Sequence, residues 1–193
     1  GGTFTRTTGV PATKNVYYDL VTPGASASDI TEVALTSMGI GEMAGNPSIA
    51  SGVVDCGGTS VAEGFMAVWE QTPATGSRTL RAGAFTLDQG LSPNRSSTFP
   101  LVTTSDDFWF PSVVGNGDFF GVVWADSRSG AHPDLYVSAI GADGAGLYPE
   151  LNVTQAATWP DEHPVIGSRG GHFGIVWNHS GGEVWFADAM CFY

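Results

Sequence analysis

Residues 119–144, FFGVVWADSRSGAHPDLYVSAIGADG, decide the fold of this chain. An apolar run ends at Trp124, a polar turn follows, and a second apolar run begins at Leu135. Two short runs of β-branched and aromatic residues on either side of a turn are typical of an antiparallel strand pair. Within the turn, we expect Asp126 and Arg128 to form a structural hydrogen-bonded pair beside Trp124 rather than a ligand site, because polar side chains commonly bond within their own turn.

The same pattern recurs along the chain. The run that ends at Trp124 is matched almost position for position by the run that ends at Trp177, 53 residues later, and Pro111 is matched by Pro164 at the same interval. An earlier copy ends at Trp69 and is nine residues longer between its proline and its tryptophan. So many matches in one order indicate an internal repeat, which is the strongest signal of fold in the chain.

We therefore predict an all-β chain, a β-propeller with four-stranded blades of about 53 residues, three to four of them present. The first strand of a unit follows the proline, the second ends at the tryptophan, the third is an aromatic run such as 135–140, and the fourth follows a glycine turn, over 147–154 in the clearest copy. The approximate units are 1–46 (partial), 47–110, 111–163 and 164–193 (partial), within one domain, 1–193. A β-sandwich is the alternative architecture.

The number of units is low for a closed ring, which usually has four to eight blades. Either the terminal segments complete a compact four-bladed ring, or the ring is incomplete and another chain supplies the rest. In the second case we expect a protein partner or second chain to cover the open sheet edges near 16–21 and 184–189, because unpaired edges are normally protected.

The clearest unit resembles the extracellular propeller-like repeats of bacterial surface and secreted proteins. The residues that carry the resemblance are Trp124, Asp126, Arg128, Gly130, Asp134, Leu135, Tyr136 and Gly144. The other copies keep the tryptophan and lose the turn, since Trp69 is followed by Glu70 and Trp177 by Asn178. The likeness covers residues 47–189. It implies a repeat scaffold, often used for adhesion or ligand binding, and a secreted, periplasmic or cell-surface location, but no catalytic residues.

Composition argues against two classes of partner. The formal net charge is −12, with 7 Lys and Arg against 19 Asp and Glu. Nucleic-acid binding depends on basic side chains that neutralise phosphate, so we expect no nucleic-acid partner. We also expect no membrane span, since no stretch approaches the roughly 20 apolar residues of a membrane helix. The chain begins GGTF, without Met, which we interpret as removal of a leader or processing of a longer chain.

The connections between the predicted blades supply a candidate ligand face, in which acidic residues stand beside aromatic ones. The candidates are Asp106, Asp107, Trp109, Trp159, Asp161 and Glu162. Rings that stack on sugar C–H faces and carboxylates that accept hydroxyl groups suit a carbohydrate, and the carboxylates also suit Ca²⁺. In the alternative interpretation the rings pack between blades and the carboxylates cap turns. The histidines lack the spacing that predicts a transition-metal site, and no other cofactor is expected.

Two functions from different classes fit such a face. The first is a non-catalytic binding or assembly module of a secreted, cell-surface or complex-bound protein. The second is a carbohydrate-active enzyme of the glycoside hydrolase type that uses two of the same carboxylates. We favour the binding module, because the sequence contains no GxSxG, HExxH or EF-hand motif.

The two cysteines, Cys56 and Cys191, are predicted to form a disulfide. Cys56 lies in the insertion that lengthens the first full unit, and Cys191 lies near the end of the last unit. A ring would bring these units together, and an exported protein would meet oxidising conditions. The alternatives are two separate buried thiols or a bond to another chain.

Overall fold

The computed structural model describes residues 2–8, 13–19, 33–55, 62–87, 93–95, 98–103, 108–117, 119–155, 159–180 and 182–190. Within these ranges the chain is entirely β, with strands in three sheets and no helix. The predicted all-β class is therefore confirmed. In the described part of the chain no helix is long and apolar enough to cross a membrane.

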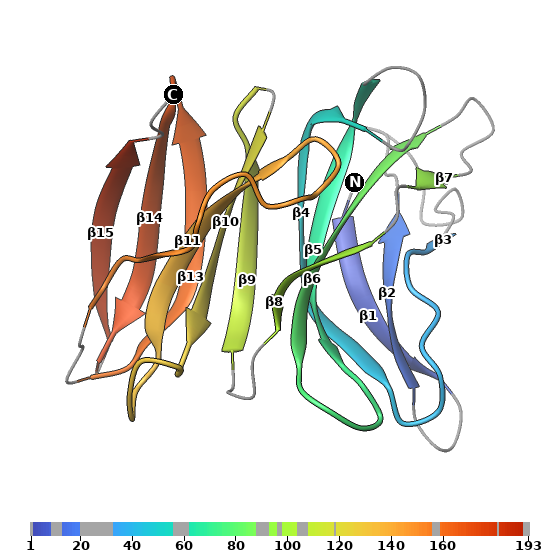
Figure 1. Cartoon of the computed structure of the whole chain (residues 1–193), viewed down its shortest axis with the longest axis horizontal. Helices are drawn as coiled ribbons and strands as arrows, with labels where there is room; N and C mark the ends of the chain where they lie inside the picture. The colour runs from blue at the N-terminus through green and yellow to red at the C-terminus, as the bar shows by residue number, and fades with distance from the viewer. Residues whose placement is uncertain are drawn as a thin grey trace.

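The sheets follow one another along the chain and stand side by side in a row (Figure 1). The first contains β1 (Gly2–Thr8), β2 (Thr13–Asp19), β3 (Val33–Ala34), β4 (Met43–Val54), β5 (Ala62–Thr72), β6 (Thr79–Leu87), β7 (Pro93–Arg95) and β8 (Phe99–Thr103). The second contains β9 (Phe108–Gly115), β10 (Phe119–Asp126), β11 (Asp134–Gly141) and β12 (Leu151–Asn152). The third contains β13 (Asp161–Arg169), β14 (His172–His179) and β15 (Glu183–Met190).

Each sheet contains the same antiparallel meander. Its order is β4-β5-β6-β8 in the first sheet, β9-β10-β11-β12 in the second and β13-β14-β15 in the third. The fourth strand of the second sheet is shorter than predicted, since β12 occupies two residues of the expected 147–154. The preceding residues bond back to β11 irregularly, through Leu147 N to Ala139 O at 2.9 Å, and Pro149 has no N–H to donate to a ladder.

The three repeat tryptophans occupy equivalent positions. Trp69, Trp124 and Trp177 lie on β5, β10 and β14, the middle strands of their meanders, and are 2%, 1% and 5% exposed. Each lies opposite a β-bulge in the first strand of its meander, where two residues of that strand face one on the neighbour. The repeat seen in the sequence is thus a repeat of strand register as well.

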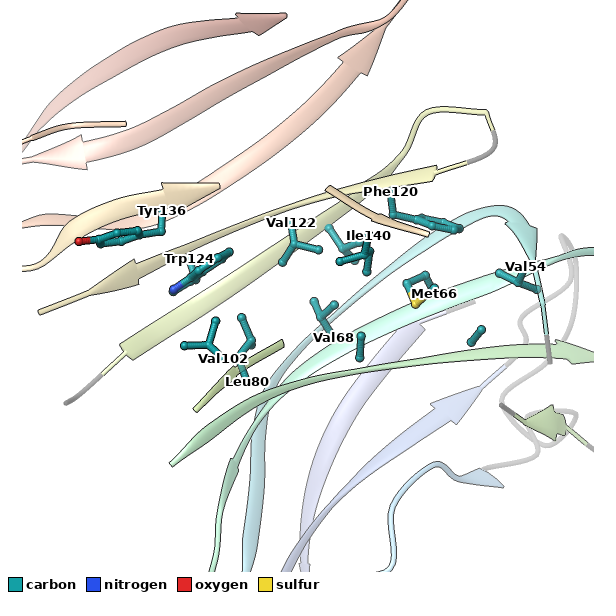
Figure 2. Close-up of a cluster of buried hydrophobic side chains, with 13 residues drawn as sticks. Val54, Met66, Val68, Leu80, Val102, Phe120, Val122, Trp124, Tyr136 and Ile140 are labelled. Atoms are coloured by element: carbon teal, nitrogen blue, oxygen red, sulfur yellow. The ribbon is translucent and has the colours of Figure 1, made fainter. Parts of the chain in front are cut away.

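Alternating side chains bury both faces of the second sheet. On β10, Phe120, Val122 and Trp124 point toward the first sheet and join Met66 and Leu80 in one apolar cluster (Figure 2). The intervening residues of β10 point the other way, into a second cluster formed with the third sheet. That second cluster contains Val123, Ala125, Leu135, Val137, Ile166, Phe173, Ile175 and Trp177. This period of two is what a strand buried on both faces requires.

The first strands of the three meanders adjoin one another, because β9 lies against both β4 and β13. Two hydrogen bonds recur there at equivalent positions: Val113 N donates to Ser48 Oγ at 3.1 Å, and Ile166 N donates to Ser112 Oγ at 3.3 Å. The sheets are therefore joined in the same way at both junctions. Among the described residues they form an open row, and no closed ring is detected.

Candidate functional site

A row of three proline bulges runs across the adjoining first strands. In each sheet the bulge consists of a residue followed by proline: Asn46 on β4, Phe110 on β9 and His163 on β13. We call these three residues the bulge row. Proline donates no backbone hydrogen bond, so within a sheet it is confined to edges and bulges. The recurring proline thus accounts for the bulge at this place in every sheet.

All three residues of the bulge row have left-handed backbone conformations. The φ angles are 44° at Asn46, 55° at Phe110 and 53° at His163. Asparagine and histidine enter this region more often than most residues, but the bulky phenylalanine rarely does, and a strained residue of this kind costs on the order of 1–3 kcal/mol. Strained residues of this kind gather at functional sites, and bulges re-aim side chains next to them.

Glu70 links the first two members of the row. Its Oε1 accepts hydrogen bonds from Asn46 Nδ2 and from the backbone N of Phe110, both at 2.8 Å. Burial raises the pKa of the Glu70 carboxyl above its usual value, although these two hydrogen bonds favour the charged form. A half-buried carboxylate therefore ties the bulge of the first sheet to that of the second.

An aromatic stack links the second and third members. The rings of Phe110 and His163 lie 3.9 Å apart between centroids with planes 23° from parallel. The His163 side chain is 50% exposed, and its Nδ1 lies 3.8 Å from the Glu162 carboxylate, which is 45% exposed. The row therefore ends in an accessible ring beside an accessible carboxylate.

The residues predicted from sequence to form the ligand face lie partly beside this row. Glu162 immediately precedes His163, and Trp159 is 58% exposed just before β13. Trp109 belongs to β9, where its backbone pairs with Ala125. The structure places residues 108–110 and 161–163 in strands rather than in connections between sheets. Asp106 and Asp107 lie outside the described residues, as do both cysteines of the predicted disulfide.

Asp161 is buried and holds its own sheet together. It is 1% exposed, and its Oδ1 is 2.8 Å from Trp177 Nε1, which donates to it, and 2.7 Å from His179 Nδ1. Its backbone N donates to Pro133 O, in the second sheet, at 3.0 Å. These contacts are structural, which agrees with the alternative interpretation of the candidate ligand face, in which the carboxylates stabilise the fold and do not bind a ligand.

The predicted turn pair is present in the second sheet. Asp126 is fully buried; its Oδ1 accepts the backbone N–H of Arg128 at 2.9 Å, and its Oδ2 accepts Arg128 Nε at 2.7 Å and Trp124 Nε1 at 3.4 Å. Burial opposes the charge of Arg128, but bonds to Asp126 and Glu150 outweigh it and raise the guanidinium pKa. The guanidinium also lies 4.4 Å above the Tyr136 ring. These residues form a packed structural turn.

The histidines do not share a site. His172 pairs with Asp188 at 3.4 Å, His179 with Asp161, and His163 with Glu162. Among the described residues no group of three or more His, Cys, Asp or Glu side chains is placed to hold a metal ion.

Sequence reasoning missed the bulge row, although a signal for it was present. The prolines at 47, 111 and 164 were recognised as repeat markers, but the residues that precede them were not. The first strand of each unit was predicted to follow the proline, whereas β4, β9 and β13 contain it, and a proline inside a strand indicates a bulge or an edge. Comparison of the chain with protein-family models, curated proteins and solved structures found no significant match in any of the three.

Proposed function

We propose that the chain is a non-catalytic binding module that acts outside the cell, with the bulge row as its ligand face and a carbohydrate as the class of ligand. The observation that carries the proposal is the Phe110–His163 stack, held at two strained bulges and continued by exposed Glu162. An aromatic face receives the C–H face of a sugar ring, and a neighbouring carboxylate accepts its hydroxyl groups.

The backbone conformation suits such a face. Because the rings of Phe110 and His163 already stack on each other, less side-chain freedom remains to be lost on binding. Trp159, which precedes β13 in the chain, is also exposed and offers a further aromatic surface. A preorganised platform of this kind binds without rearrangement of the scaffold.

The finer architecture belongs to the same proposal: the three sheets are successive blades of a β-propeller. Equivalent strands of successive propeller blades surround a central channel. The adjoining strands β4, β9 and β13 and the repeated Ser48–Val113 and Ser112–Ile166 bonds support this arrangement. In such a propeller the bulge row faces the central channel, and a ligand would reach it through an open end of that channel.

The buried carboxylates favour binding over hydrolysis. Asp126 is occupied by Arg128 and Trp124, and Asp161 by Trp177 and His179. Asp134 accepts hydrogen bonds from Ser129 Oγ and, at 2.9 Å, from Asn152 Nδ2. Each of the three serves the folding of its own repeat, so none is free to act as the acid or base of a glycosidase.

The test is an NMR titration of the isotopically labelled chain with a panel of neutral and N-acetylated oligosaccharides. We expect a panel member to shift the amide signals around Phe110 and His163. His163→Gly should abolish the shifts without loss of stability, since glycine adopts the positive φ more readily. The control is His132→Ala, which changes an exposed histidine in the β10–β11 turn.

Three results would contradict the proposal. One is the absence of shifts with every saccharide, the second is equal binding by the His163→Gly variant, and the third is cleavage of a panel member. Cleavage would instead support the glycoside hydrolase alternative.

A further inference from the structure

The third sheet stands at one end of the row of sheets, and its outward surface changes in character along the strands (Figure 1). Side chains such as Ile175 pack against the second sheet, so the residues that alternate with them point outward. Strand pairing arranges the outward residues in three successive rows across the sheet: Val165, Val176 and Phe186; then Gly167, Gly174 and Asp188; then Arg169 and His172. Two adjacent glycines therefore separate an apolar row from a polar row.

The two glycines form the floor of a hollow of about 620 Å³, which we call the glycine trough. A Cβ atom at Gly167 would meet nothing within 4 Å, so this part of the floor is open. At Gly174 the ring of Phe186 lies alongside, 3.3 Å from the place of a Cβ atom, and Phe186 is still 66% exposed. The Phe186 ring is thus an aromatic wall of the trough.

The remaining lining of the trough is polar. His172 Nδ1 lies 3.4 Å from Asp188 Oδ1, and this pair of half-exposed side chains places a carboxylate at the β15 side. Arg169 lies at the β13 side; it is exposed and forms no ion pair with any other residue in the described ranges. A cation without a partner and a carboxylate therefore stand on strands that are two strand spacings apart, which is about 10 Å.

Comparison with the second sheet shows that the repeat does not require these residues. The positions of Gly167, His172 and Asp188 correspond in the second sheet to Val114, Phe119 and Ala139. There Val114 and Phe119 pack against the third sheet, and Ala139 is buried. The third sheet thus has an open floor and hydrogen-bonding groups where the second sheet has the apolar side chains of an interface. A covering sheet would bury these polar groups without partners, at a cost that a polar ligand avoids.

We propose that the glycine trough binds a sugar ring that carries a carboxylate, namely a hexuronate unit of an acidic polysaccharide. The C–H face of the ring packs on Phe186, and Asp188 accepts hydroxyl groups. The guanidinium of Arg169 matches the planar carboxylate of the sugar and donates two parallel hydrogen bonds to it. The open floor at Gly167 leaves the room that the ring needs.

This site is separate from the bulge row. His163 and Arg169 are both on β13 but six residues apart, which is about 20 Å along a strand. The net charge of −12 repels an anion at long range. At about 0.15 M salt, however, charges more than about 8 Å away are largely screened, so the nearby Arg169 has the larger effect on a bound carboxylate.

The test is an NMR titration at about 0.15 M salt with hexuronate trisaccharides, each compared with the neutral hexose trisaccharide of the same linkage. We expect a hexuronate to shift the amide signals of the two trough glycines and to bind at least about tenfold more tightly than its neutral counterpart. Arg169→Gln should remove this preference. Gly167→Val introduces the residue that the second sheet has at this position, fills the trough and should abolish binding. The controls are Arg81→Gln, an exposed arginine of the first sheet, and Gly130→Val, where a Cβ atom also meets nothing within 4 Å.

The proposal fails if no hexuronate shifts the trough signals, if the neutral counterpart binds as tightly, or if the Gly167 and Arg169 variants bind like their controls. Urea unfolding checks that both variants fold; we expect no loss of stability, because both positions are exposed and valine suits a strand better than glycine. His163→Gly, which removes the proposed ligand at the bulge row, should leave the response of the trough unchanged. Either site can therefore fail its test without the other.

Discussion

The substitution Gly121→Ala tests whether the sheets pack as closely as described. A Cβ atom at this position would lie 2.6 Å from Cε1 and Cζ of Phe173, whereas carbon atoms in contact prefer about 3.5–4.0 Å. The Phe173 ring, which is 4% exposed, must therefore move by about 1 Å within a packed cluster. Overpacking of this kind costs roughly 1–3 kcal/mol. The loss of glycine from a strand returns about 0.5–1 kcal/mol, so the net cost is about 0–2.5 kcal/mol, with a central value near 1 kcal/mol.

The assay is urea and thermal unfolding followed by tryptophan fluorescence. At roughly 2–4 °C per kcal/mol for a chain of this size, the central net cost of about 1 kcal/mol lowers the melting temperature by about 2–4 °C. Gly174→Ala is the matched control, because a Cβ atom there meets only the exposed Phe186 ring at 3.3 Å and that ring is able to turn away. Equal stability of the two variants, or a larger loss at Gly174, would refute the packing argument.

Two further predictions concern ionisation and oxidation. The raised pKa of Glu70 means that its stabilising contribution is complete below the unfolded value of 4.5 and is lost as pH rises through the higher folded value, because the half-buried carboxylate then ionises. Glu70→Gln retains the Oε1 acceptor but does not ionise, so its free energy of unfolding in urea should depend less on pH than that of the wild type. The control is Glu63→Gln, which changes an exposed glutamate. An unchanged pH dependence in the Glu70 variant would contradict the raised pKa of Glu70. The disulfide between Cys56 and Cys191 stays a prediction: intact mass after alkylation should show no free thiol before reduction and two afterwards, and reduction should lower stability by about 4–5 kcal/mol in the chain-entropy model. Alkylation of both cysteines in the native, unreduced protein would exclude it.

Local patterns in the sequence were sufficient to predict the strands that carry the repeat tryptophans and the aromatic strands that follow them. The runs that end at Trp69, Trp124 and Trp177 have the β-branched and aromatic composition of strands, and the residues between runs have the chemistry of turns. The Asp126–Arg128 pair was also predictable, since its partners are two residues apart and bond within one turn. Such features depend on neighbours along the chain, which a sequence displays directly.

Contacts between distant segments were decided by the tertiary structure. Trp124 donates to Asp126 on its own strand, but the equivalent Trp177 donates to Asp161, 16 residues away on the neighbouring strand. Strand register decides which carboxylate lies within hydrogen-bonding distance of the indole, and the residues next to Trp177 in the sequence do not indicate that this carboxylate is Asp161. Asp161 was consequently considered a ligand candidate.

The bulge row and the exposed apolar side chains of the third sheet, such as Val176, show the same division between local and distant causes. The sequence by itself determined that a proline recurs at the first strand of each unit and that apolar and aromatic runs form strands, because these follow from residue type. That the strands β4, β9 and β13 contain the proline, instead of following it as predicted, was decided by the tertiary structure. Only the packing of β9 between β4 and β13 set Phe110 against His163, and only the order of the sheets left Val176 exposed while its equivalent Val123 is buried. The physical reason is that identical repeats acquire different surroundings from their place in the row, and burial depends on the neighbouring sheet rather than on the residue.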